Sequence, residues 1–195
     1  MGRVREQGRS LFPTLMIVVG VGVLLQGAWI PVKAMVAQLL LQRAWSQSAS
    51  MNHPVKPWPW ADTWPVARLS VPRIGVEQIV LHGDSGPMLA FGPGLSTAGS
   101  LPGEGGTVLI GGHRDTHFRF LKELKPGDAI QITRQTHAPM HYRVVSTRIV
   151  DARRTVIRQE MGEERLVLAT CYPFGEAIPG GPLRYLVEAS TLSSG

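Results

Sequence analysis

Cysteine is almost absent from this 195-residue chain, in which Cys171 stands alone. A disulfide within the chain requires two thiols, and a metal site built from cysteines requires several, so the sequence excludes both. Carboxylates are also sparse: Asp84, Glu104 and Asp128 lie separately at predicted turns and form no cluster of the oxygen ligands that calcium prefers. We therefore expect the protein to need no metal ion.

Long basic tracts are missing too. The 20 Lys and Arg residues and 14 Asp and Glu residues give a net charge of +6, and the basic residues are scattered rather than gathered in a helix or arm. This pattern argues against a nucleic-acid partner. With 22 Gly and 15 Pro, the chain leaves little room for long helices beyond its N-terminus, which indicates a turn-rich globular domain with an N-terminal extension.

One long apolar run is present, at residues 11–30. Its sequence, LFPTLMIVVGVGVLLQGAWI, carries no charge, and residues 1–10 before it contain Arg3, Arg5 and Arg9. A helix rises about 1.5 Å per residue, so this length crosses a hydrocarbon core of about 30 Å. Because no small-x-small cleavage site follows, we predict an uncleaved single-pass transmembrane anchor in the inner (cytoplasmic) membrane. The preceding arginines predict a cytoplasmic N-terminus and a periplasmic, extracytoplasmic domain.

Two connecting segments follow the predicted anchor. Residues 31–51 have apolar side chains near helical spacing and are predicted to form a helical stem. Residues 52–66 contain four prolines and three tryptophans, which predicts a stiff extended linker because proline fixes φ and lacks a backbone donor. We expect the tryptophans to pack this linker onto the domain rather than to bind a ligand.

Residues 67–192 show the pattern of short strands. Apolar residues alternate or run together between Gly and Pro, and only the segment FRFLKELKPGD, residues 118–128, has helical character. Two neighbouring segments, DAIQITRQ (128–135) and MHYRVVSTRIV (140–150), are typical of a hairpin. Some seven or eight such strands predict an all-β domain, either a closed antiparallel barrel or a sandwich.

Three polar stretches lie at predicted strand ends. They are GGHRDTHF (111–118), ATCY (169–172) and GGPLRY (180–185). One rim of a barrel can therefore present Cys171, His113 and Arg184 together. This set suits acyl transfer: a thiolate attacks a peptide carbonyl, an imidazole moves protons at the two amines, and a guanidinium stabilises the charge on the carbonyl oxygen.

Each of these residues also has a plainer interpretation. Cys171 is a small side chain that a core can bury, and Arg184 can pair with Glu188 along its own strand. His117 competes with the histidine named above, although it lies beyond the Arg-Asp-Thr turn. Asp115 serves equally well as a turn residue or as a supporting group that orients a histidine. As a set at three strand ends, on the far side of a membrane, these residues favour a working thiol.

The stretches PGEGGTVLIGGHRDTHFRFLKEL, LVLATCYPF and GGPLRYLV resemble the sortases, and the linker PVKPWPWADTWPVARL resembles that of the Gram-negative type, class GN. The resemblance implies a closed eight-stranded sortase-like β-barrel with short helices and no cofactor. It also implies active-site roles for His113, Cys171 and Arg184, with Thr170 lining the substrate groove. Val167 departs from the T-L-x-T-C pattern of the family, but it keeps the branched shape of threonine and loses only a hydroxyl.

The same resemblance implies a cysteine transpeptidase, of the cysteine peptidase (hydrolase) class. Its substrate would be a protein with an LPXTG-like sorting signal, cleaved between Thr and Gly through a thioester, and its acceptor an amine in the cell envelope. Two other functions stay open. An L,D-transpeptidase acting on peptidoglycan typically has an arginine two residues after the cysteine, where this chain has Pro173. A non-enzymatic envelope scaffold would bury Cys171.

Overall fold

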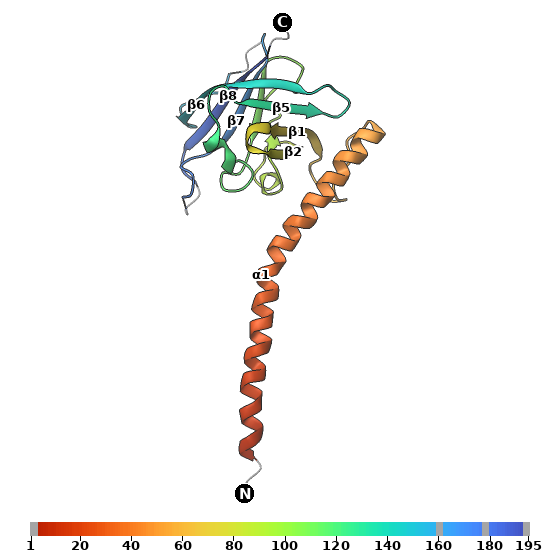
Figure 1. The fold of residues 1–195 in the computed structure, drawn as a ribbon, viewed down its shortest axis with the longest axis vertical. Helices are drawn as coiled ribbons and strands as arrows, with labels where there is room; N and C mark the ends of the chain where they lie inside the picture. The colour runs from red at the N-terminus through yellow and green to blue at the C-terminus, as the bar shows by residue number, and fades with distance from the viewer. Residues whose placement is uncertain (1–3, 159–161, 177–179, 193–195) are drawn as a thin grey trace. The chain divides into compact units, whose positions relative to one another are not determined.

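The computed structural model describes residues 4–158, 162–176 and 180–192, and Figure 1 shows its fold. Within these ranges a long helix, α1 (Val4–Met51), precedes a domain of eight strands and three short 3-10 helices. The strands are β1 (Pro65–Val71), β2 (Val76–His82), β3 (Gly94–Leu95), β4 (Thr107–Gly111), β5 (Ala129–Arg134), β6 (Met140–Asp151), β7 (Arg165–Cys171) and β8 (Leu183–Thr191). The 3-10 helices are η1 (Pro72–Ile74), η2 (Met88–Ala90) and η3 (Arg119–Glu123).

The strands close into a barrel in the order β1-β2-β3-β4-β7-β8-β6-β5, and β5 pairs back to β1. This confirms the predicted closed eight-stranded barrel, including the hairpin, which forms β5 and β6. Two pairs, β2–β3 and β4–β7, are parallel, so the prediction of a wholly antiparallel barrel is wrong there. The chain passes through β5 and β6 between β4 and β7, and such a crossover lets two neighbouring strands run in the same direction.

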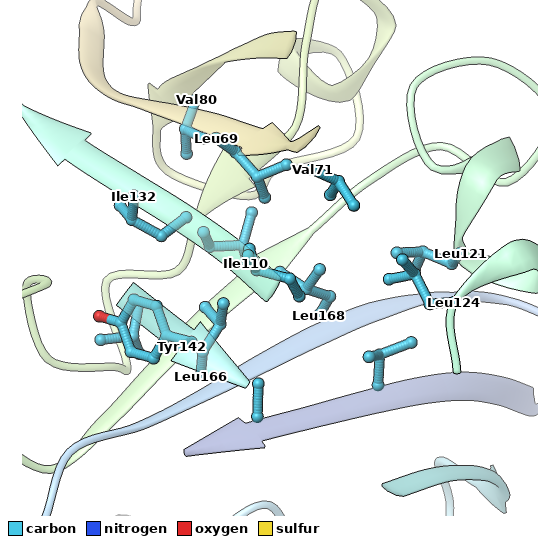
Figure 2. Packing of buried hydrophobic residues seen from close by; sticks show 14 of the residues in the cluster. Leu69, Val71, Val80, Ile110, Leu121, Leu124, Ile132, Tyr142, Leu166 and Leu168 are labelled. Atoms are coloured by element: carbon cyan, nitrogen blue, oxygen red, sulfur yellow. The ribbon is translucent and has the colours of Figure 1, made fainter. Parts of the chain in front are cut away.

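Alternate residues of the strands point into the barrel. In β1, buried and half-exposed positions alternate strictly, and Ala67, Leu69 and Val71 are all fully buried. Figure 2 shows side chains from several strands meeting in one cluster, among them Ile110 from β4 and Leu168 from β7. Because side chains of a strand alternate between its two faces, the residues between these core positions face outward. The outer face of β4, β7 and β8 therefore presents a second set of side chains, which form the candidate site.

Helix α1 runs through the residues predicted as anchor (11–30) and as stem (31–51) without interruption. Of the helical segments that the structure describes, none combines the length and the apolar character that a membrane crossing requires. The structure therefore gives no support to the transmembrane span predicted at 11–30.

The chain divides into two compact units after residue 39. The second unit contains the last turns of α1 together with the barrel. In this unit Leu41 and Trp45 pack against Ile79 and Leu81 of β2 and form a second, smaller apolar cluster. The C-terminal part of α1 is thus an integral layer of the barrel domain rather than a free stem.

The linker packs onto the barrel through aromatic contacts. Trp64 stacks on His82 with ring centroids 4.1 Å apart, and Trp58 meets Phe91 edge-on at 5.0 Å. Trp60 is instead 80% exposed. The prediction that the tryptophans pack this segment onto the domain is therefore confirmed for Trp58 and Trp64 only.

Candidate active site

The strand register brings the three predicted residues to one rim of the barrel. In the parallel β4–β7 pair, Gly111 is opposite Ala169. His113 and Cys171 each follow one of these partners by two positions, so they leave neighbouring strands at the same level. In the antiparallel β7–β8 pair, Cys171 is opposite Arg184. Strand β7, which ends at Cys171, therefore lies between β4, which leads into His113, and β8, which carries Arg184.

Cys171 is the last residue of β7, and it is exposed to solvent. Thr170 points the other way: it is only 3% exposed, and its Oγ1 donates a hydrogen bond to the Gly112 carbonyl at 2.7 Å. Thr170 thus ties the end of β7 to the residue after β4 and does not line the outer surface, in contrast to what the family resemblance implies. The exposed thiol also rules out the interpretation of Cys171 as a buried apolar side chain.

A tight turn holds His113 just beyond β4. The Phe118 N–H donates to the His113 carbonyl at 3.0 Å, and the Phe118 ring packs directly over Gly112. A Cβ on Gly112 would lie 2.5 Å from that ring, so only glycine fits between the strand and the histidine. The imidazole is exposed, and its Nδ1 accepts a hydrogen bond from the Asp115 backbone N–H at 3.4 Å. The neutral ring then carries its proton on Nε2.

The Asp115 carboxylate is paired with Arg114 rather than with His113. The Arg114 Nε and Nη2 groups donate to the two carboxylate oxygens at 2.8 to 3.0 Å. This hydrogen bonding holds the pKa of Asp115 below its ordinary value, although burial acts in the opposite direction. Asp115 therefore hydrogen-bonds the histidine through its backbone N–H, while the charge of His113 is the smallest of the influences that lower the pKa of the Asp115 carboxyl.

His117, the competing histidine, is half-buried between β2 and η2. Its Nδ1 lies 3.3 Å from the Gln78 Oε1 atom, and its Nε2 lies 3.4 Å from the Ala90 carbonyl. Burial lowers the pKa of His117, while the Ala90 carbonyl opposes this shift. The structure thus places His117 in the packing of the η2 segment, and His113 is the histidine next to the strand that carries the thiol.

Arg184 is half-buried at the start of β8. Its Nη1 group donates to the carbonyls of Gly181 at 2.8 Å and Leu183 at 2.9 Å. The alternative pairing with Glu188 is wrong, because that carboxylate binds Arg148 at 2.7 Å. Among the residues that the structure describes, none accepts a hydrogen bond from the Nε or Nη2 group of Arg184. A guanidinium has five N–H donors, so Arg184 can also bind the carbonyl oxygen of a peptide.

A groove of about 150 Å³ lies on the outer face of β4 and β7. Its lining residues are Asp84, Leu109, Gly111, Val150, Ala152, Thr155, Ile157, Ala169, Arg184 and Leu186. Most of these side chains are apolar, and the two charged ones are Asp84 and Arg184. Because Ala169 precedes Cys171 by two positions on the same strand face, the groove leads toward the thiol. It suits an extended peptide whose reacting carbonyl lies next to a guanidinium.

Two charged residues of this region are missing from the set predicted from the sequence. Asp84 lies just beyond the end of β2, and its position at a strand end is the signal that could have identified it. Arg114 stands in the GGHRDTHF stretch, but its exposure of only 6% is not expected of an arginine. Within the described residues, no group of three or more His, Cys, Asp or Glu residues gathers so as to hold a metal ion.

An exposed thiol whose neighbouring strands carry an imidazole and a guanidinium, beside a largely apolar groove on a closed barrel, is the arrangement of a cysteine enzyme of the acyl-transfer class. Known proteins agree with this class. The family model described as Sortase domain matches residues 69–192 of the chain. The chain therefore belongs to the sortase family, whose members are cysteine transpeptidases.

Individual relatives support the same assignment. Sortase D of Bacillus subtilis (strain 168) is 34% identical over 120 residues, which are 61% of this chain and 60% of that protein, so the match spans less than two thirds of the relative. The solved structure of a Clostridium perfringens Sortase D5 transpeptidase has a TM-score of 0.65 at 22% identity, and covers 82% of this chain and 99% of that one. Sortase C-1 from Actinomyces oris has a TM-score of 0.59 at 28% identity, with 66% and 72% covered. These likenesses confirm the predicted sortase fold.

Proposed function

We propose that this protein is a transpeptidase that cleaves an LPXTG-like sorting signal between Thr and Gly and transfers the acyl group to an amine of the cell envelope. The observation that carries the proposal is the exposed Cys171 opposite Arg184, which itself lines a largely apolar groove. The Leu-Pro part of such a signal is extended and apolar, and it fits a lining of this kind. No metal or organic cofactor takes part in the proposed reaction.

In the first half-reaction, the Cys171 thiolate attacks the threonine carbonyl carbon and forms a C–S bond. Negative charge moves onto the carbonyl oxygen, where the available N–H groups of Arg184 stabilise it. The C–N bond then breaks, and protonated His113 gives its proton to the leaving amine. The result is a thioester between the substrate and Cys171, with His113 left neutral.

In the second half-reaction, an acceptor amine attacks the thioester carbonyl and transfers a proton to the neutral His113. The C–S bond breaks, a new amide forms and the Cys171 thiolate is restored. Arg184 keeps its charge throughout, because a guanidinium does not release a proton near neutral pH, so its role is electrostatic. Water in place of the amine gives hydrolysis by the same steps.

The variant Cys171→Ala tests this function. We expect it to lower the rate of cleavage of a sorting-signal peptide by about 10⁴-fold or more, because no other group can form the thioester. Circular dichroism checks that the domain is still folded, and mass spectrometry of the wild type should detect a thioester on the peptide that contains Cys171. Undiminished cleavage by the folded variant would falsify the proposal. Cleavage of a muropeptide in place of the sorting peptide would favour the L,D-transpeptidase.

We also propose that the barrel domain acts on the extracytoplasmic side of the inner membrane and is attached to it by the N-terminal segment. The support for this part is the sequence: an uncharged run at 11–30 that follows three arginines. Attachment to the membrane that also holds the substrate replaces tight binding by a high effective concentration, so weak affinity for free peptide is expected.

We further propose that the protein belongs to the Gram-negative type, class GN. The support is the linker sequence PVKPWPWADTWPVARL, whose Trp58 and Trp64 make aromatic contacts with the domain. These contacts give Trp58 and Trp64 a structural role in holding the linker on the barrel. Membership of this type leaves the chemistry proposed above unchanged.

A further inference from the structure

Arg114 follows His113 directly, and the reaction steps proposed above make no use of it. It is only 6% exposed, although its guanidinium is charged at any pH near neutral. Burial of a charge is costly unless the charge is paired and its hydrogen bonds are satisfied. The partners of Arg114 therefore show what the buried charge does.

These partners belong to two segments that are far apart in the sequence. On the side of β4, Nε and Nη2 bind the Asp115 carboxylate. On the side of β7, Nη1 donates to the Pro173 carbonyl at 2.6 Å, and Nη2 donates to the Glu176 carbonyl at 2.5 Å. One guanidinium thus joins the turn that carries His113 to the segment that follows the thiol.

We propose that Arg114 is a positioning residue that fixes the segment after Cys171 to the turn of His113. Its hydrogen bonds fix the distance between the backbone segment that carries Cys171, the nucleophile, and the turn that carries His113, the acid–base group. The catalytic consequence rests on the proposed function, whereas the joining of the two segments does not depend on it.

The electrostatics of Arg114 agree with a position next to the thiol. Its hydrogen bond to Asp115 raises the pKa of Arg114, and burial opposes this effect. The negative charges of Asp115 and of the Cys171 thiolate then add to the rise. Since Asp115 is 42% exposed and the Arg114 side chain 7%, water screens the carboxylate more than the guanidinium.

Only arginine suits this position. The planar guanidinium presents its N–H groups as a fixed fork, which can bind one carboxylate on one edge and two carbonyls on the other. Lysine keeps the charge but has a single donor atom, so Arg114→Lys keeps some bonds and loses the bridge. Arg114→Gln loses the charge as well.

A matched control is present elsewhere in the barrel. Arg73 binds the Asp128 carboxylate through Nε at 2.6 Å and Nη2 at 2.8 Å, and also donates to the Glu123 carbonyl at 2.7 Å. This arrangement has the same chemistry but joins η1 to the last residue of η3 and to the turn that follows it, and neither Arg73 nor its partners line the groove. Arg73→Gln therefore measures the loss of such a bridge away from the thiol.

The first experiment measures hydrogen–deuterium exchange of the backbone N–H groups within residues 172–176 in the full chain, which are those of Tyr172, Phe174, Gly175 and Glu176 because Pro173 has none. Exchange should be faster in Arg114→Gln, intermediate in Arg114→Lys and unchanged in Arg73→Gln. The second experiment measures cleavage of a sorting peptide at a temperature at which every variant is folded. The kcat of Arg114→Gln should fall about 10²-fold with little change in KM, because a small displacement of reacting groups has this effect on rate and Arg114 does not line the groove.

The outcomes separate the two claims. Unchanged exchange at 172–176 in both Arg114 variants would overturn the proposed bridge, whatever the activity. Faster exchange with an unchanged kcat, or an equal fall of kcat in Arg73→Gln, would overturn the positioning role. If the wild type cleaves no sorting peptide, the proposed function fails, while the exchange experiment still decides on the bridge. If Arg114→Gln does not fold, Arg114→Lys alone must show the faster exchange and lower kcat, and its failure to do so contradicts the proposal.

Discussion

Arg114 and Arg184 use the same side chain in opposite ways. Arg114 is buried and donates to a carboxylate and two carbonyls through all three of its nitrogen atoms. Arg184 is half-buried, and its hydrogen bonds to the described residues come from Nη1 alone. The first arrangement holds backbone segments in place, and the second leaves donors for a ligand. Burial and hydrogen bonding thus separate a positioning arginine from one that can act on a substrate, which residue type alone does not do.

A buried carboxylate has a comparable structural role at the other end of β7. Glu164 is 9% exposed, and its Oε2 accepts hydrogen bonds from the N–H groups of Gly103 at 2.7 Å and Gly105 at 3.0 Å. Its Oε1 accepts a hydrogen bond from the fully buried Tyr142 hydroxyl. Burial, together with this bond, raises the pKa of Tyr142. The loop before β4, β6 and β7 are therefore joined at one carboxylate.

Tyr142→Phe should lower the free energy of unfolding by about 1–2 kcal/mol at pH 7, because Glu164 then loses a partner in a buried site. The raised pKa of Tyr142 means that folding favours the neutral hydroxyl. Its contribution is thus complete below the ordinary tyrosine pKa of about 10 and is lost as the pH rises above it. Urea unfolding at pH 7, 9 and 11 checks both points, and the difference between wild type and variant should shrink at the highest pH. Equal stability at pH 7 would contradict the role of this bond.

At the scale of elements, the end of β4 depends on one close approach. Gly112→Ala would place a methyl group 2.5 Å from the Phe118 ring, which is fully buried. We expect a loss of about 1–3 kcal/mol in the free energy of unfolding from this overpacking, and lower peptide cleavage because His113 is displaced. Urea unfolding and the cleavage assay measure the two effects.

Two further variants test the reason for that loss. Gly86→Ala is the matched control, because a Cβ at Gly86 has no neighbour within 4 Å, and it should leave stability nearly unchanged. The double variant Gly112→Ala with Phe118→Leu should recover part of the activity, since the smaller side chain frees space for the methyl group. If the double variant is less active than Gly112→Ala alone, the contact with the ring is not what positions His113.

The strand ends that carry the site are visible in the sequence. Glycine and proline punctuate the apolar runs around His113, Cys171 and Arg184, and this local signal does not depend on the rest of the fold. The pairing of β4 with β7 is different, because 53 residues separate the ends of these two strands, Gly111 and Arg165, and no local pattern specifies a parallel neighbour at that distance. The strand pattern predicts either a barrel or a sandwich, and the resemblance to the sortases is what predicts the closed barrel.

Side-chain direction was the least predictable feature of the site. Thr170 and Cys171 are adjacent, yet one bonds inward to Gly112 and the other is exposed. The sequence suits Asp115 equally to two roles, and in the structure its carboxylate binds Arg114. The direction of a side chain and its hydrogen-bond partner depend on which polar groups meet after the strands have paired. The sequence around each residue therefore does not predict them.

At the scale of the whole molecule, the boundary after residue 39 differs from the boundary expected from the sequence, where the stem ran from 31 to 51. Leu41 is fully buried and Trp45 is 9% exposed, both against β2, and the Trp45 ring also lies 5.6 Å from the Arg68 guanidinium. The Trp45 carbonyl accepts a hydrogen bond from Gln135 at 3.3 Å. The last turns of α1 therefore contribute to the stability of the barrel domain, whereas residues before 40 belong to the other unit.

Two truncated chains test this division together with the proposed membrane attachment. A chain that begins at Leu40 should unfold at the same urea concentration as the full chain and should cleave the sorting peptide. This chain should appear in the soluble fraction, whereas the full chain should sediment with membranes and resist extraction with carbonate. A chain that begins at residue 52 should lose about 2–5 kcal/mol, because Ile79 and Leu81 are uncovered. Equal stability of the two truncated chains would show that Leu41 and Trp45 do not support the barrel. A full chain that is soluble without detergent would contradict the attachment, even if it cleaves the peptide.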